Sequence, residues 1–107
     1  MKLRIEDDTL RLRLSDAEVR EFAATGRVVA AVHFGAAAGQ QLTYALERAD
    51  ASAVGVLYAP GALTVQVPRA LADAWTTTAQ NGFSEHVALA DARQLRILVE
   101  KDLDCRH

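Results

Sequence analysis

Apolar and polar side chains alternate strictly in two short segments near the start of the chain, residues 2–6 and 10–14. Such alternation is typical of strands with one buried face, and Asp7-Asp8 between the segments supplies a turn. The pattern predicts a β-hairpin whose apolar face carries Leu3, Ile5, Leu10, Leu12 and Leu14. The opposite face then carries Arg4, Arg11 and Arg13.

A helix is predicted directly after this hairpin. Ser15 and Glu18 have the spacing of a capping box, Val19 and Phe22 fall on one side of the helix, and Gly26 provides a stop. The valine-rich residues 27–34 are predicted to form a strand and residues 35–39 a loop of small residues. Residues 41–48 alternate again and predict another strand.

The second half of the chain repeats this order. Strands are predicted at residues 53–58 and 63–67 around a turn at 59–61. A helix is predicted from Pro68, with Leu71 and Trp75 one turn apart. Two more strands follow at residues 83–89 and 94–100, and residues 101–107 stay unassigned.

A single offset of 53 residues aligns the two halves without gaps. It places Phe22 on Trp75, His33 on His86, and the apolar positions 10, 12 and 14 on 63, 65 and 67. We therefore predict one domain, 1–107, built from pseudo-repeats 1–52 and 53–107. The predicted fold class is α+β, with about eight mostly antiparallel strands and two helices that cover parts of the apolar faces. The strands either close into a barrel or split into two packed sheets.

The polar faces of these strands hold the candidate chemistry. They would line a lumen in a closed barrel and face water in an open sheet, and they carry Arg4, Glu6, Arg11, Arg13, Thr43, Glu47, Thr64, Gln66, Arg96 and Glu100. Because arginine forks bind phosphates and carboxylates with two hydrogen bonds, the arginines predict an anion-binding wall. A solvated face, with arginines paired to glutamates such as Glu6, is the alternative. The candidate ligand-binding residues are Arg4, Arg11, Arg13, His33, His86, Arg96, Glu100 and Lys101.

Motifs for metal binding and catalysis are weak. His33 and His86 would meet across the repeat axis and could join Cys105 or His107 around zinc, but no closely spaced ligand pair occurs. Cys105 has no neighbouring base in the sequence. We predict no metal, no cofactor and no catalytic residue.

Composition and charge narrow the environment. The chain has 107 residues, a formal net charge of −2 and one cysteine, so an internal disulfide is excluded and nucleic acid is not expected as a partner. No apolar run reaches the roughly 18–20 residues of a membrane helix, and no signal peptide is present. These features predict a cytoplasmic protein without a membrane partner.

Several segments resemble an uncharacterised family of small bacterial proteins, a domain of unknown function. The resemblance spans nearly the whole chain and is carried by residues 2–5, 10–14, 34–35, 42–46 and 99–102, followed by Cys105. It implies no activity. The duplicated architecture is also similar to the triphosphate tunnel fold of adenylate cyclases and thiamine triphosphatases. Those enzymes begin with Glu-x-Glu-x-Lys, whereas this chain has Lys2-x-Arg4-x-Glu6, so no catalytic residue carries over.

Three functions remain open. The first is a non-catalytic binding or accessory module whose arginine-bearing face holds an anionic small molecule or a protein. The second is a phosphohydrolase-like enzyme that acts in a polar barrel lumen. The third is a self-associating protein, a homodimer that pairs exposed strand edges.

Overall fold

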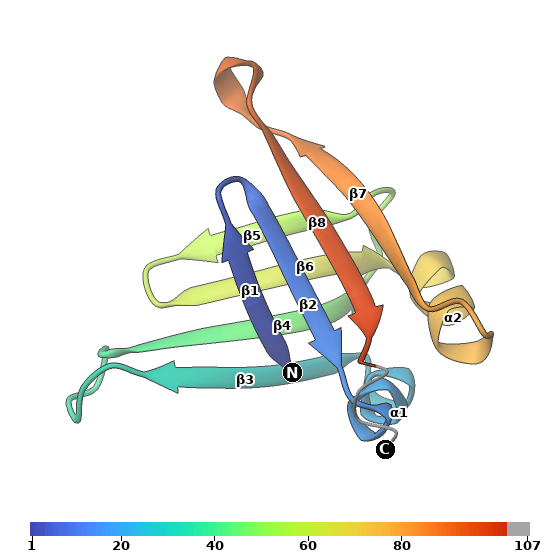
Figure 1. The fold of residues 1–107 in the computed structure, drawn as a ribbon, viewed down its shortest axis with the longest axis horizontal. Helices are drawn as coiled ribbons and strands as arrows, with labels where there is room; N and C mark the ends of the chain where they lie inside the picture. Colours follow the sequence, from blue (N-terminus) through green and yellow to red (C-terminus); the bar gives the residue numbers. More distant parts are fainter. Residues whose placement is uncertain (103–107) are drawn as a thin grey trace.

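The computed structural model of the chain describes residues 1–102; the positions of Cys105 and His107 in the tail, 103–107, lie outside that range. Eight strands form two four-stranded sheets (Figure 1). Sheet A has the order β1 (Lys2–Glu6), β2 (Thr9–Leu14), β8 (Gln94–Lys101) and β7 (Gly82–Ala88). Sheet B has the order β3 (Arg27–His33), β4 (Gln41–Ala49), β6 (Ala62–Pro68) and β5 (Gly55–Ala59). The helices are α1 (Asp16–Thr25), α2 (Arg69–Thr77) and the short 3-10 helix η1 (Ala90–Ala92).

Each repeat contributes one hairpin to each sheet. In the first repeat, β1 and β2 lie in sheet A, α1 connects the two sheets, and β3 and β4 lie in sheet B. In the second repeat, β5 and β6 lie in sheet B, α2 connects the sheets, and β7 and β8 lie in sheet A. The four hairpins are antiparallel, and the two repeats join through the parallel pairs β2–β8 and β4–β6. The α+β fold and its duplicated strand-strand-helix-strand-strand order are confirmed, and neither half forms a sheet alone.

The ends of α1 follow the local signals in the sequence. Ser15 Oγ accepts from the Glu18 backbone N–H at 3.2 Å, and the Glu18 carboxylate accepts from the Ser15 N–H at 2.9 Å. At the other end Gly26 adopts the left-handed conformation with φ of 80°, and its N–H donates to the Phe22 carbonyl. Glycine suits this position because other residues are strained there.

The Glu18 carboxylate also pairs with the amino group of Met1, which is buried. Burial by itself would raise the pKa of Glu18, but hydrogen bonds from the Met1 amino group and from Ser15 outweigh it and lower the pKa below its ordinary value. The N-terminal strand is thereby tied to the start of α1.

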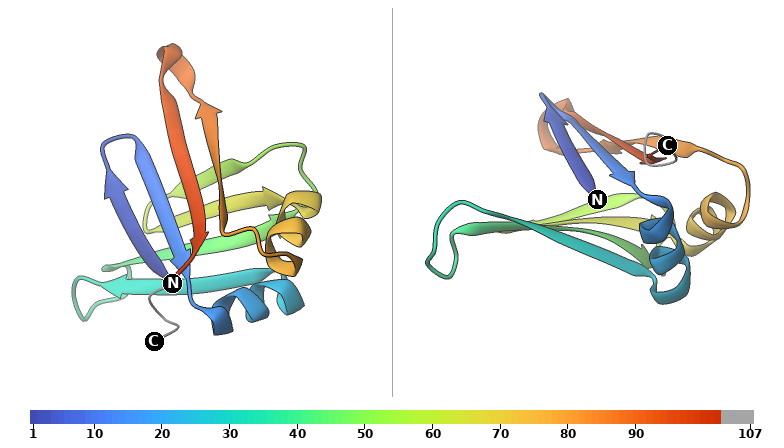
Figure 2. Two further views of the ribbon diagram at one scale, coloured as in Figure 1. Left: turned by 45° about the vertical axis from the view of Figure 1, so that its right-hand side comes forward. Right: turned by 60° about the horizontal axis from the view of Figure 1, so that its bottom comes forward.

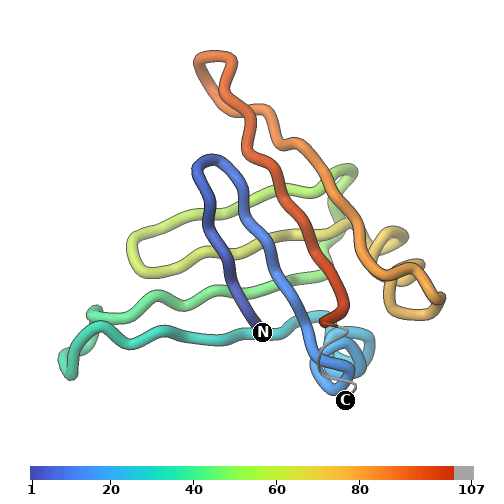
Figure 3. The backbone as a smooth tube through the Cα atoms, in the orientation of Figure 1, coloured from blue at the N-terminus to red at the C-terminus, as the bar shows by residue number. Residues whose placement is uncertain are grey.

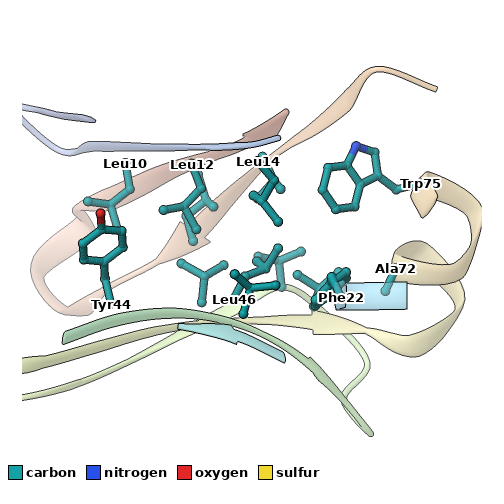
Figure 4. Close-up of a cluster of buried hydrophobic side chains, with 14 of the residues drawn as sticks. Leu10, Leu12, Leu14, Phe22, Tyr44, Leu46, Ala72 and Trp75 are labelled. Atoms are coloured by element: carbon teal, nitrogen blue, oxygen red, sulfur yellow. The ribbon is translucent and has the colours of Figure 1, made fainter. Parts of the chain in front are cut away.

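The apolar faces of the two sheets pack against each other, as Figure 4 shows for the leucines of β2 facing Tyr44 and Leu46 of β4. The helices cover only one end of these faces (Figure 2), where Phe22 and Trp75 meet edge-to-face with ring centroids 5.9 Å apart. Each sheet presents an apolar face that is four strands wide, which is more than one short helix can cover. The apolar face of each sheet is therefore buried mainly by the other sheet. Away from the helices the sheets diverge, so that Ile5 and Tyr58 lie exposed on inner positions.

Of the two architectures that the sequence left open, the packed sheets are correct. Among residues 1–102 the strands belong to two separate sheets with β1, β7, β3 and β5 at the edges, so the lumen expected for the barrel does not form. No helix among residues 1–102 is long and apolar enough to cross a bilayer.

The predicted equivalence of His33 and His86 is wrong. The offset of 53 residues holds for most strands, but in the last hairpin Phe83 pairs with Val99 where Val28 pairs with Leu46, an offset of 55 for the outer strand. The link between α2 and β7 is longer than that between α1 and β3, and the connection at 89–93 is two residues shorter than that at 34–40. The tube in Figure 3 shows the connections at 34–40 and 89–93 at the tips of their hairpins. His86 is therefore equivalent to Ala31.

Candidate functional site

The outer face of sheet A gathers most of the predicted site residues. Leu10, Leu12 and Leu14 of β2 are buried between the sheets, so the alternate residues of the strand point outward. Register then fixes their neighbours: Arg4 lies opposite Arg11, and Lys2 opposite Arg13. We call this surface the arginine face; its ionisable residues are Lys2, Arg4, Glu6, Arg11, Arg13, His86, Arg96 and Glu100.

Strands β8 and β7 complete the arginine face. On β8, Arg96 lies beside Thr9, Leu98 beside Arg11, and Glu100 beside Arg13. On β7, His86 lies beside Arg96 and is exposed. Residues from both ends of the chain thus share one surface because β2 and β8 pair in parallel.

A shallow hollow of about 290 Å³ lies on this face toward the β1–β2 turn, lined by Arg4, Glu6, Thr9, Arg11, Arg96 and Leu98. A neighbouring hollow is lined by Lys2, Leu3, Arg4, Arg11 and Arg13. Arg4 and Arg11 line both hollows, so an anion in either one would meet these two guanidinium groups.

Two glutamates neutralise part of the arginine face. Arg11 Nε donates to the Glu100 carboxylate, and Arg13 Nε lies 4.0 Å from the same carboxylate. The hydrogen bond to Glu100 raises the pKa of Arg11, although partial burial opposes the shift. Arg4 pairs with Glu6 at 3.0 Å, an exposed contact that contributes little stability.

The charge balance of the face remains positive. Its four arginines and two glutamates leave a surplus of two positive charges. Lys2 does not add to this surplus, because its Nζ pairs with the buried Asp102 at 2.6 Å. The Arg96 side chain is exposed and makes no hydrogen bond or ion pair with any residue in 1–102. The chain as a whole carries −2, so positive charge is concentrated here.

The other predicted site residues lie elsewhere. His33 is exposed on the outer face of sheet B, so the two histidines do not meet. Lys101 points away from the arginines and its Nζ donates to the Thr78 carbonyl at 2.8 Å. Four residues expected on the shared polar face, Thr43, Glu47, Thr64 and Gln66, also lie on the outer face of sheet B.

Sequence reasoning missed two members of the arginine face and one buried charge. Lys2 and Thr9 continue the outward positions of the first hairpin, and simple alternation could have found them. Asp102 is buried, with its side chain 2 % exposed, and no local pattern marks it. In residues 1–102 no three His, Cys, Asp or Glu side chains come together to hold a metal ion.

A model for a family of unknown function (DUF7009) matches residues 1–107 of the chain. The chain belongs to this family. No curated protein matches it, and no solved structure matches it. Membership of the DUF7009 family therefore brings no activity, and function has to be argued from the arginine face itself.

Proposed function

We propose that this DUF7009 protein is a non-catalytic binding module that holds a small phosphate- or carboxylate-bearing anion on the arginine face. Guanidinium groups bind both kinds of anion through paired, charge-assisted hydrogen bonds. The hollow at Arg4, Arg11 and Arg96 would receive the ligand, with the Thr9 hydroxyl beside it as a further hydrogen-bonding group.

The comparison between the two sheets carries this proposal. The pair Arg4–Arg11 on sheet A occupies the same place in the fold as the pair Leu57–Thr64 on sheet B. Arg96 likewise corresponds to Thr43. The same architecture thus forms with uncharged residues at these places, so folding does not require the arginines.

Placing the arginines there also brings like charges together. Like charges directly opposite each other on neighbouring strands destabilise a sheet, and Arg4 and Arg11 form such a pair. A binding function explains why the positive charges lie together. The alternative enzyme that acts in a barrel lumen loses its site, because the strands of residues 1–102 form two separate sheets and the arginines of β1, β2 and β8 point outward.

The test titrates the full chain with inorganic phosphate, triphosphate and citrate at constant ionic strength, and follows binding by calorimetry and by the melting temperature. A ligand of the native state raises the melting temperature by mass action. Arg96→Thr and Arg4→Leu place at each site the residue found on sheet B. Each lost charge-assisted pair is worth about 1.5–3 kcal/mol, so affinity should fall about tenfold to 100-fold.

Arg20→Gln is the matched control, because Arg20 is exposed on α1 and lies off the arginine face. It changes the net charge by the same amount as each test variant and should leave the affinity unchanged. Equal losses in all three variants would mean that only the net charge matters, and the site would be wrong. Absence of binding to all three anions at about 10 mM, far above the dissociation constants of specific small-anion sites, would also reject the proposal.

A further inference from the structure

The outer face of sheet B has the opposite character to the arginine face. Its central positions carry no charge, and we call this surface the neutral face; it consists of Val29, Ala31, Thr43, Ala45, Leu57, Ala59, Ala62 and Thr64. Val29 is 47 % exposed and Leu57 is 56 % exposed. Helices α1 and α2 lie at one end of the sheets, and no other element of residues 1–102 lies over this face (Figure 2, right).

Folding does not dictate the lack of charge. The equivalent positions on sheet A hold Glu6 in place of Ala59 and the Arg4–Arg11 pair in place of Leu57–Thr64. A sheet face in water ordinarily carries polar and charged side chains. The lack of charge on the neutral face is therefore unusual for an exposed sheet, and the fold does not require it.

We propose that the neutral face is a homodimer interface, covered by the neutral face of a second copy of this chain. A two-fold dimer places the same patch of each copy against the other, so the patch must complement itself. An uncharged face meets this condition, because its own copy brings no repelling charge. A charged partner would find no opposite charge among these eight residues.

The area of the neutral face and its borders agrees with a weak dimer. The four strands of sheet B hold 28 residues, and a rise of about 3.3 Å per residue with about 4.8 Å between strands gives about 440 Å² of sheet face, so two copies would bury on the order of 900 Å². This area lies at the low end of the range for specific interfaces, where weak and transient complexes are found. At the border near the helices, Arg27 and Glu47 pair at 3.7 Å and neutralise each other.

The small side chains of the face fit close packing of two sheets. Alanine and threonine dominate its centre, and Ala45 is already buried by its neighbours. Packed sheets lie about 10 Å apart and interdigitate their side chains, and Val29 and Leu57 on the two edge strands would fill the sides. In this dimer the two arginine faces point away from each other and both stay open.

Sedimentation velocity of the full chain from about 1 to 500 µM tests the dimer, with a dissociation constant on the order of 100 µM expected for a weak interface of this size. The variant Leu57→Arg/Thr64→Arg copies the Arg4–Arg11 pair onto the neutral face. It should raise the dissociation constant at least about 100-fold, because like charges would meet across the two-fold axis. Ala59→Glu, which copies Glu6, is a second variant and should act in the same direction.

The control is Arg4→Leu/Arg11→Thr, which makes the reverse change on the arginine face and should leave the dissociation constant unchanged. Circular dichroism melting shows whether each variant folds. If the double arginine variant does not fold, the dissociation constant of Ala59→Glu tests the interface. A wild-type chain that stays monomeric to about 500 µM would overturn the proposal. So would an unchanged dimer in both neutral-face variants, which would place the interface at strand edges or at the open end near Ile5 and Tyr58.

Discussion

Phe22 and Trp75 join the two repeats at the helix end of the core, and their contact makes a sharp prediction about stability. Both side chains are fully buried, and their rings meet edge-to-face at 5.9 Å. Trp75 also meets Phe83 at 5.8 Å, and its Nε1–H donates to the Asn81 carbonyl at 3.0 Å. The perturbation is Phe22→Leu, Trp75→Leu and the double variant.

The magnitudes follow from these contacts. Phe22→Leu keeps an apolar side chain but loses ring volume, and should cost about 1–2 kcal/mol of unfolding free energy. Trp75→Leu loses more volume and also removes one of the two hydrogen bonds that the Asn81 carbonyl accepts, the other coming from the Lys101 N–H, so about 2–4 kcal/mol is expected. Because the rings contact each other, the double variant should lose about 0.5–1.5 kcal/mol less than the sum of the two single losses.

Urea denaturation measures these free energies. Far-UV circular dichroism is the appropriate signal, because Trp75 is the only tryptophan and its removal would abolish the fluorescence change. All variants are compared at one protein concentration, since self-association would stabilise the native state by mass action. Phe34→Leu is the matched control: Phe34 is 73 % exposed, so the same substitution there should cost less than about 0.5 kcal/mol.

Two results would refute this reasoning. Single losses that add to within about 0.3 kcal/mol would mean that the two rings do not share a contact. A Phe22→Leu loss equal to that of Phe34→Leu would mean that Phe22 is not in the core. Either result would remove the strongest packing evidence that the two repeats close on each other through their helices.

Two further predictions concern pH and backbone space. The pKa of Glu18 is lowered in the folded chain, so the contribution of Glu18 to stability is present above the ordinary carboxyl pKa of about 4.3 and is lost as the pH falls through the lower folded value. The variant Glu18→Gln should therefore show a smaller fall of melting temperature in that acid range. Glu21→Gln, on the exposed side of α1, should behave like the unchanged chain. Gly82→Ala would bring a Cβ into a clash with the Val99 carbonyl oxygen, whereas a Cβ at Gly55 meets nothing within 4 Å. The melting temperature should therefore drop clearly for Gly82→Ala and stay nearly unchanged for Gly55→Ala, and equal shifts would contradict the packing at β7.

Most of the secondary structure could be predicted because its signals are local. Alternation in residues 10–14 fixed which side of β2 is buried, since successive side chains of a strand point to opposite faces. Ser15, Glu18 and Gly26 fixed the ends of α1 through hydrogen bonds made within a few residues. The repeat was visible for the same reason, because both halves carry the same local pattern.

The candidate site was predicted only in part. The sequence placed Arg4, Arg11 and Arg13 on one face, because they belong to one hairpin. It joined Thr43 and Thr64 to the same polar surface, whereas the structure places them on the other sheet. It also misaligned His86 by two residues, because the shift arises from two connections of unequal length, each of which is locally acceptable.

Alternation by itself determined that each strand of this protein has an apolar and a polar side, and therefore that charged residues would gather outside an apolar core. Only the tertiary structure decided which strands share a sheet, through the parallel pairing of β2 with β8 and of β4 with β6. That pairing joins residues more than 80 positions apart on sheet A, and no local preference encodes a contact over such a separation. The separation of one arginine face from one neutral face, on which both proposals rest, follows from that pairing.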